Sequence, residues 1–212
     1  MSEQPAAPWH PVALSTDVPI GVTRSVILEN REIVLWRGGD GAIHAWDDRC
    51  PHRGMRLSYG FIRGGSLNCL YHGWEYEGSS RCIRIPAHPD LEVPKTIRAT
   101  AYAARETGGL IWMTLDSANT SEPPVSPVAV PLITTAVNRP IGEVRRFLGH
   151  EPAAAIVIRD GLVLALHEAT DGKTLLHALC LADSDDPAFR KAAAAKVREL
   201  RRQAEAFIQE AA

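Results

Sequence analysis

Two cysteines and two histidines lie in two short, similar segments between residues 50 and 72. The first segment holds Cys50 and His52 as Cys-x-His, and the second holds Cys69 and His72 as Cys-x-x-His. Thiolates and imidazoles bind zinc, copper and iron readily in proteins. A catalytic Cys–His pair needs only one residue of each type and leaves the second pair unexplained. We therefore predict that the four residues bind a metal ion or a metal cluster.

The order of these four residues distinguishes two kinds of metal site. Structural zinc sites are tetrahedral, and zinc fingers usually pair cysteine with cysteine and histidine with histidine. Here each segment supplies one sulfur and one nitrogen. A Rieske [2Fe–2S] centre fits this arrangement. One of its irons has two cysteine ligands and the other has two histidine ligands, so each segment can supply one ligand to each iron. A structural zinc site is the alternative.

The neighbours of the four residues suit tight loops around such a cluster. Pro51 stiffens the first segment. Gly54 and Gly73 follow the two histidines closely, and glycine lets a backbone approach a ligand and turn its N–H groups toward it. Backbone N–H groups directed at the sulfur atoms stabilise a negatively charged cluster and influence its potential.

The stretches CPHRG and CLYHGW resemble the two cluster-binding loops of Rieske iron–sulfur domains. The longer stretches WHPVALSTDVP, IVLWRGGDGAIHAWDDRCPHRG and LNCLYHGWEYEGSSRCIRIP resemble the N-terminal part of ring-hydroxylating oxygenase subunits. The resemblance covers roughly residues 9 to 115. It implies one [2Fe–2S] cluster per chain, with Cys50 and Cys69 on one iron and His52 and His72 on the other.

Rieske proteins of the cytochrome bc type carry an additional cysteine in each loop, and the two form a disulfide. This chain has no additional cysteine in either loop. The resemblance therefore implies the disulfide-free type, with a potential nearer to about −150 mV than to about +300 mV.

Short strand-like stretches with frequent glycine turns surround the two loops. The stretch from Val26 to Trp36 reads as a hairpin, Ala42 to Trp46 as a strand, and residues 100–115 as a closing hairpin around Gly108 and Gly109. This pattern is typical of a β-sandwich or a small barrel. We predict a mainly β Rieske domain, an ISP-like β-sandwich, over residues 1–118.

A different composition follows this domain. Residues 119–131 are rich in proline and read as a linker. Two Asp-Gly pairs, at residues 160–161 and 171–172, indicate hairpin turns. Asp186 and Pro187 then suit the start of an amphipathic helix of about 25 residues. We predict that residues 132–212 form a small α+β domain, a three-strand meander plus a long C-terminal helix.

The oxygenases that this chain resembles pass electrons to a second iron, which is bound by two histidines and a carboxylate. Most of that triad has the form Asp/Asn-x-x-His-x₃₋₄-His, and residues 117–212 contain no such motif. His150, His167 and His177 are the histidines of this stretch. A two-residue turn at Asp171-Gly172 would place His167 and His177 on opposite faces of a sheet. The meander and helix resemble the closing half of a helix-grip fold, so this part is either a shortened catalytic domain or an unrelated docking module.

Composition excludes several classes of function. The net charge is −2, so we expect no nucleic-acid partner. No apolar run approaches the ~20 residues of a membrane span, so we expect no membrane partner. The N-terminus lacks the pattern of a signal peptide. These features predict a cytoplasmic protein, in which paired cysteines are more often metal ligands than disulfides.

These observations favour an oxygenase-associated electron carrier without catalytic residues of its own. It would take single electrons from a flavin- or ferredoxin-type reductase and pass them to an oxygenase or another acceptor. One alternative is a terminal Rieske non-haem iron oxygenase, of the ring-hydroxylating or demethylating type, whose iron site is atypical or supplied by a partner. Another is a non-catalytic redox-sensing subunit. An oligomer is compatible with each hypothesis.

Overall fold

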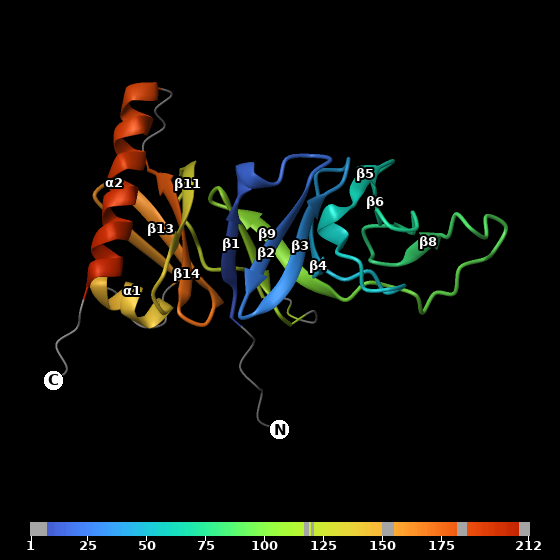
Figure 1. The fold of residues 1–212 in the computed structure, drawn as a ribbon. Coiled ribbons are helices and arrows are strands. Elements are labelled where there is room, and N and C mark those ends of the chain that lie inside the picture. The colour runs from blue at the N-terminus through green and yellow to red at the C-terminus, as the bar shows by residue number, and fades with distance from the viewer. Residues whose placement is uncertain (1–7, 117–118, 120, 150–154, 182–185, 208–212) are drawn as a thin grey trace.

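Stretches rich in valine, isoleucine and aromatic residues form most of the strands, as their composition predicts. The structure, a computed structural model, describes residues 8–116, 119, 121–149, 155–181 and 186–207. Within them the chain forms two β-rich units that lie side by side (Figure 1). We call residues 8–116 the N-terminal unit and the described residues from 130 to 207 the C-terminal unit.

The larger sheet of the N-terminal unit has six strands in the order β1-β10-β9-β4-β3-β2, and all its pairings are antiparallel. Both predicted hairpins and the strand between them are present in it, which confirms the prediction of a mainly β fold. The strands are β1 (His10–Leu14), β2 (Thr23–Leu28), β3 (Arg31–Arg37), β4 (Ile43–Asp47), β9 (Ala101–Thr107) and β10 (Leu110–Thr114).

A second, smaller sheet holds the two cysteine–histidine loops. Its order is β5-β6-β7-β8, with the strands β5 (Phe61–Arg63), β6 (Ser66–Asn68), β7 (Glu75–Tyr76) and β8 (Cys82–Arg84). One loop runs from β4 to the short 3₁₀ helix η2 (Leu57–Tyr59), and the other joins β6 to β7. A second 3₁₀ helix, η1 (Ser15–Asp17), follows β1. The two loops therefore meet at one end of the N-terminal unit (Figure 1).

One buried cluster of side chains joins the small sheet to the large one. Trp36 and Trp46 of the large sheet pack against each other at 4.9 Å between ring centroids. The same cluster contains Tyr76 of the small sheet together with Cys50 and Cys69. The two cysteines thus lie inside the apolar core that orients their loops.

The C-terminal unit is one antiparallel sheet, in the order β11-β14-β13-β12, with helices on one face. The predicted three-strand meander is present, and a fourth strand, β11, pairs with β14. The helix at Asp186-Pro187 is also present, with Asp186 Oδ1 accepting a hydrogen bond from the Ala188 N–H at 2.9 Å. The elements are β11 (Val130–Val137), α1 (Ile141–Phe147), β12 (Ile156–Arg159), β13 (Leu162–Thr170), β14 (Lys173–Cys180) and α2 (Pro187–Ala206). Neither α1 nor α2 is long and apolar enough to span a membrane.

The two faces of this sheet have different neighbours. Leu164, Leu176 and Val197 belong to the core between the sheet and α2. On the other face, Val163 and Leu179 pack with residues of the N-terminal unit, among them Trp112. The sheet therefore lies between α2 and the N-terminal unit (Figure 1).

Two hairpin tips also join the units through their backbones. Glu29 and Asn30 form the β2–β3 turn with positive φ angles of 49° and 64°. The Glu29 N–H donates to the Glu168 carbonyl at 3.1 Å, and the Asn30 N–H donates to the Ala169 carbonyl at 2.9 Å. The register of β13 against β14 shifts between Glu168 and Thr170, so Ala169 is an extra residue in the strand.

Candidate metal centre

The two cysteine–histidine loops have the same backbone structure. In the first, the Cys50 N–H donates to Met55 O at 2.8 Å and the Gly54 N–H donates to Cys50 O at 2.8 Å. In the second, the Cys69 N–H donates to Trp74 O at 2.9 Å and the Gly73 N–H donates to Cys69 O at 3.0 Å.

Gly54 and Gly73 have φ angles of 73° and 68°, a conformation that glycine adopts without strain. Both loops therefore need glycine four residues after the cysteine. This Cys-x₃-Gly repeat is visible in the sequence.

The two thiols form a buried pair. Cys50 and Cys69 are 3% and 2% exposed. A hydrogen bond from the Cys69 thiol, together with one from Tyr76, lowers the pKa of Cys50 to about 6. Tyr76 Oη lies 3.2 Å from Cys50 Sγ. Burial raises the pKa of Tyr76, so its hydroxyl keeps its proton and donates to the sulfur. This environment favours the thiolate, which is the form that binds metals, at Cys50, whereas the same hydrogen bond and burial raise the pKa of Cys69.

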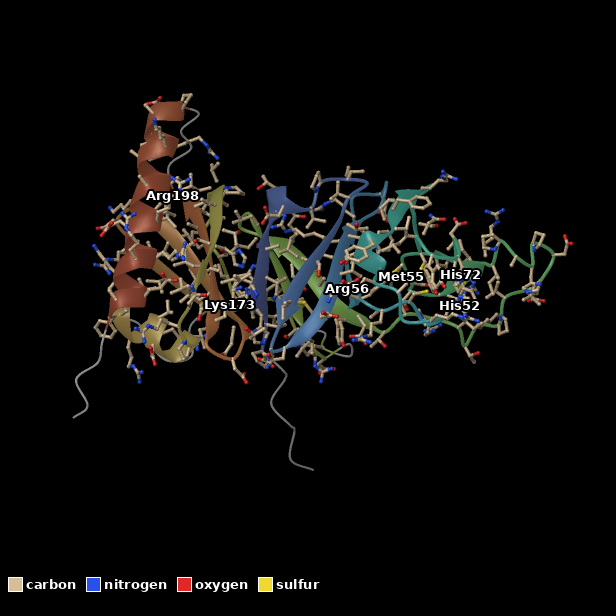
Figure 2. All side chains as sticks on the ribbon, in the orientation of Figure 1. His52, Met55, Arg56, His72, Lys173 and Arg198 are labelled. Atoms are coloured by element: carbon tan, nitrogen blue, oxygen red, sulfur yellow. The ribbon has the colours of Figure 1, made fainter. Side chains whose placement is uncertain are left out.

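The two imidazoles form a second pair beside the thiols. The rings of His52 and His72 lie 4.6 Å apart between centroids. Trp74 stacks on His52 at 4.3 Å, and Tyr71 lies 3.8 Å from the His72 ring. His52 is half-buried and His72 is exposed. Figure 2 shows both histidines in the part of the molecule away from α2, beside the green loop that extends farther in that direction.

The pairing of like atoms fits a binuclear iron–sulfur cluster. Two sulfurs lie together inside and two imidazoles lie together nearer the surface, which matches two donors for each iron. Moreover, His52 Nδ1 is buried and has no hydrogen-bond partner among the described residues. A buried nitrogen without a partner is costly, and a metal would satisfy it. A single zinc ion would instead need all four donors around one point.

Residues 8–95 match the family model described as the Rieske [2Fe–2S] domain. The N-terminal unit is a Rieske domain. It binds a [2Fe–2S] cluster, and it is of the type found in ring-hydroxylating oxygenases. The sequence resemblance is therefore confirmed for the domain and its cofactor.

Several proteins are similar to this Rieske domain. Oxidoreductase NdmD of Pseudomonas putida is 39% identical over 123 residues, which are 58% of this chain and 20% of NdmD. The oxygenase subunit of 3-chlorobenzoate-3,4-dioxygenase from Comamonas testosteroni is 33% identical over 107 residues, which are 50% of this chain and 25% of that subunit. The chain thus spans about a fifth to a quarter of the length of these relatives.

The structural likeness extends beyond the Rieske domain. The crystal structure of apo dicamba monooxygenase has a TM-score of 0.75 at 18% identity, and the match covers 95% of this chain and 86% of that one. The structure of NdmA from Pseudomonas putida has a TM-score of 0.73 at 21% identity, covering 97% of this chain and 83% of NdmA. The fold of the C-terminal unit is therefore included in the likeness.

A buried carboxylate supports the first loop of the Rieske domain. Asp48 is 0% exposed. It accepts hydrogen bonds from the Ser58 N–H at 2.6 Å, the Ser58 hydroxyl at 2.6 Å and the Ser25 hydroxyl at 3.3 Å. It thereby ties η2 to the residues before Cys50. Sequence reasoning did not find this role, because Ser25 and Ser58 are distant from Asp48 in the chain.

His167 and His177 lie on the same face of the sheet, which corrects the prediction of opposite faces. The extra residue at Ala169 shifts the register, so His167 pairs with Leu175 instead of Leu176. His167 Nδ1 then lies 3.1 Å from His177 Nε2. Both rings are buried. His150, the remaining histidine of this part of the chain, lies outside the described residues.

Burial keeps both rings of this histidine pair neutral, and the hydrogen bonds then indicate the tautomers. His167 Nε2 lies 3.1 Å from the Ile27 carbonyl, which can only accept, so Nε2 carries a hydrogen. His167 Nδ1 therefore accepts from His177 Nε2. The Thr134 hydroxyl, 2.9 Å from His177 Nδ1, donates in turn. Both rings are neutral, and burial lowers the pKa of His167 to about 4 and the pKa of His177 well below its usual value.

Proposed function

We propose that this chain is a one-electron carrier of a Rieske oxygenase system. In this proposal, Cys50 and Cys69 bind one iron of the cluster, and His52 and His72 bind the other. The observation that carries the proposal is the pair of imidazoles in the part of the Rieske domain away from α2, where His72 is exposed (Figure 2). A redox centre whose ligands reach the surface can exchange electrons with a second protein over a short distance.

The residues of the chain have separate tasks in this reaction. The cluster supplies reversible one-electron chemistry when it is bound. The buried thiols and the Tyr76 hydroxyl hold its inner side away from water. Trp74 covers one face of His52, so the exposed ring of His72 is the nearer exit for an electron. Leu70 and Tyr71 beside it are 57% and 56% exposed and offer a small apolar contact for a partner.

The proposed electron donor is a flavin- or ferredoxin-type reductase, and the proposed acceptor is an oxygenase or another redox protein. Rieske oxygenase family members receive electrons from such reductases. The name of the relative NdmD also describes it as an oxidoreductase. These partners suit a domain whose redox centre lies at one end.

The sequence and the C-terminal unit support a carrier over a complete oxygenase. This sequence has no Asp/Asn-x-x-His-x₃₋₄-His motif after residue 116. In the described part of the chain, no three His, Cys, Asp or Glu side chains gather around a point that could hold a single metal ion. His167 and His177 use both ring nitrogens in hydrogen bonds. We propose that residues 132–212 are a shortened helix-grip domain without its iron.

A terminal oxygenase is the second candidate. One observation favours it: the likeness to dicamba monooxygenase covers 95% of this chain, so it includes the C-terminal unit as well as the Rieske domain. The second iron would then need an atypical site or ligands from a partner chain.

Metal analysis and spectroscopy of one anaerobic preparation distinguish the two candidates. The carrier is expected to contain about two irons and two acid-labile sulfides per chain, without zinc, and to give a rhombic EPR signal after reduction. Nitric oxide should add no signal from a separate ferrous iron. A third, ferrous iron that binds nitric oxide would overturn the proposal in favour of the oxygenase.

A further inference from the structure

A cavity of about 280 Å³ lies between the Rieske domain and the C-terminal unit. Strand β2 forms one side, and β11 and the β13–β14 hairpin form the other. Leu175 and His177 line it. Their neighbours Leu176 and Ala178 pack against α2, so the cavity lies on the sheet face away from that helix. Its size suits a ligand smaller than a typical drug molecule.

Part of the cavity wall is aliphatic, and polar or charged residues form the rest. Val12, Val26 and Ile27 contribute from the Rieske domain, and Ala169 and Leu175 contribute from the C-terminal unit. No aromatic ring other than the imidazole of His177 lines it. The aliphatic side chains favour a ligand with an aliphatic chain, because burying apolar surface is favourable.

Two cations stand at the rim without partners. Arg24 of β2 and Lys173, the first residue of β14, both line the cavity and are exposed. Neither has an ion pair or a side-chain hydrogen bond within the described residues. Lys173 lies where the C-terminal unit faces the Rieske domain, whereas Arg198 lies on α2 (Figure 2). The charge of Arg24 also reaches the buried His177.

The acidic residue of the lining is already engaged by the protein. Asp17 Oδ2 accepts a hydrogen bond from the Leu14 N–H at 3.3 Å and lies 3.5 Å from Thr134 Oγ1. The two cations therefore outnumber the one carboxylate, and they come from opposite sides of the cavity. An anionic group between Arg24 and Lys173 would compensate them, and a charge-assisted hydrogen bond is the stronger kind.

We propose that this cavity binds a small aliphatic carboxylate, with the carboxylate between Arg24 and Lys173 and the chain against the aliphatic part of the wall. The site is independent of the electron-carrier proposal. Ser25 also lines the cavity, and its hydroxyl donates to Asp48 at 3.3 Å. A ligand here therefore touches the strand that supports the cluster loop.

The test is isothermal titration calorimetry of the cluster-loaded full chain with hexanoate, hexanamide, hexylamine and acetate. We expect hexanoate to bind with 1:1 stoichiometry. Hexanamide has the same shape without the charge, and acetate has the charge without the aliphatic chain. Both are expected to bind at least about tenfold more weakly, since each lacks one of the two interactions.

Charge-removing variants locate the site. Arg24→Gln and Lys173→Gln should each weaken hexanoate binding about tenfold. Arg198→Gln, which removes a similar exposed cation from α2, should leave it unchanged. Unchanged thermal unfolding would show that the variants are folded. The proposal is overturned if hexanoate does not bind, if hexanamide or hexylamine binds as tightly, or if both cavity variants bind hexanoate like the parent.

Discussion

Cys69 and Cys82 are both buried cysteines of the Rieske domain, but they have different partners. Cys69 forms a hydrogen bond with Cys50, whereas the Cys82 thiol faces the Arg84 carbonyl at 3.6 Å. Cys69→Ala should therefore remove nearly all cluster iron and sulfide, because one iron loses half of its protein ligands. Cys82→Ala is the matched control and should retain the cluster. Visible absorption with metal analysis checks both, and a Cys69→Ala protein with full iron would contradict the assignment.

Tyr76 donates a hydrogen bond to a proposed cluster ligand, Cys50 Sγ, at 3.2 Å. Such a bond stabilises the more negative, reduced state of a cluster. Tyr76→Phe should therefore lower the reduction potential, by about 40 mV if the bond favours the reduced state by about 1 kcal/mol. Voltammetry of the variant measures this shift. Tyr59→Phe, which changes an exposed tyrosine, is the control. An unchanged potential in Tyr76→Phe would refute the role.

The cysteine–histidine loops could be predicted from the sequence because each is a local structure. Cys50 and Gly54 have the same spacing as Cys69 and Gly73, and the same backbone hydrogen bonds follow. The hydrogen-bond partner of the Cys50 sulfur could not be predicted in this way. Tyr76 reaches that sulfur across 26 residues of sequence, and only the folded core brings the two together.

At the scale of elements, Asp48 holds the loop between β4 and η2. Its three hydrogen bonds come from Ser25 and Ser58, and its side chain is buried. Asp48→Ala should lower the free energy of unfolding by about 3 kcal/mol, because it leaves the Ser58 N–H without its charged acceptor. Chemical denaturation measures the loss. Asp90→Ala, at an exposed position, is the control and should change stability by less than about 0.5 kcal/mol. Equal stability of the two variants would exclude this role for Asp48.

The strands and the long helix could largely be predicted, and the differences have physical causes. Strand β11 begins at Val130, inside the stretch predicted as a linker. Proline suggests a linker, but Pro131 is tolerated because β11 is an edge strand with an irregular register at that point. The extra residue at Ala169 also could not be predicted from the neighbouring sequence. Its carbonyl accepts from Asn30 of the other unit, a contact between distant parts of the chain.

At the scale of the whole molecule, the two units share a buried polar connection. It begins at the Ile27 carbonyl of the Rieske domain, passes through His167 and His177, and ends at Thr134 beside Asp17. The surrounding interface is apolar, with Trp112 and Leu179 in its core. The two rings face each other nitrogen to nitrogen, so the hydrogen bond between them is lost when both carry a second proton, and burial disfavours each charged ring. The contact between the units should therefore weaken in acid.

The sign and the pH range of this effect follow from the pKa of His167. Burial lowers it from 6.5 to about 4, so below pH 6.5 the unfolded chain binds a proton that the folded chain does not. Stability from this residue is complete above pH 6.5 and falls by about 1.4 kcal/mol per pH unit as the pH drops toward 4, a total of about 3 kcal/mol. His177 acts in the same direction.

The variant His167→Gln tests this effect. Its free energy of unfolding should fall less steeply as the pH drops, by the contribution of one proton, when denaturation is measured at a series of pH values. His88→Gln, at an exposed site, should keep the parent slope. Parallel curves for the parent and His167→Gln would mean that the pair is not buried and neutral in solution. Because parent and variant are compared at each pH, any acid lability of the cluster cancels from the difference.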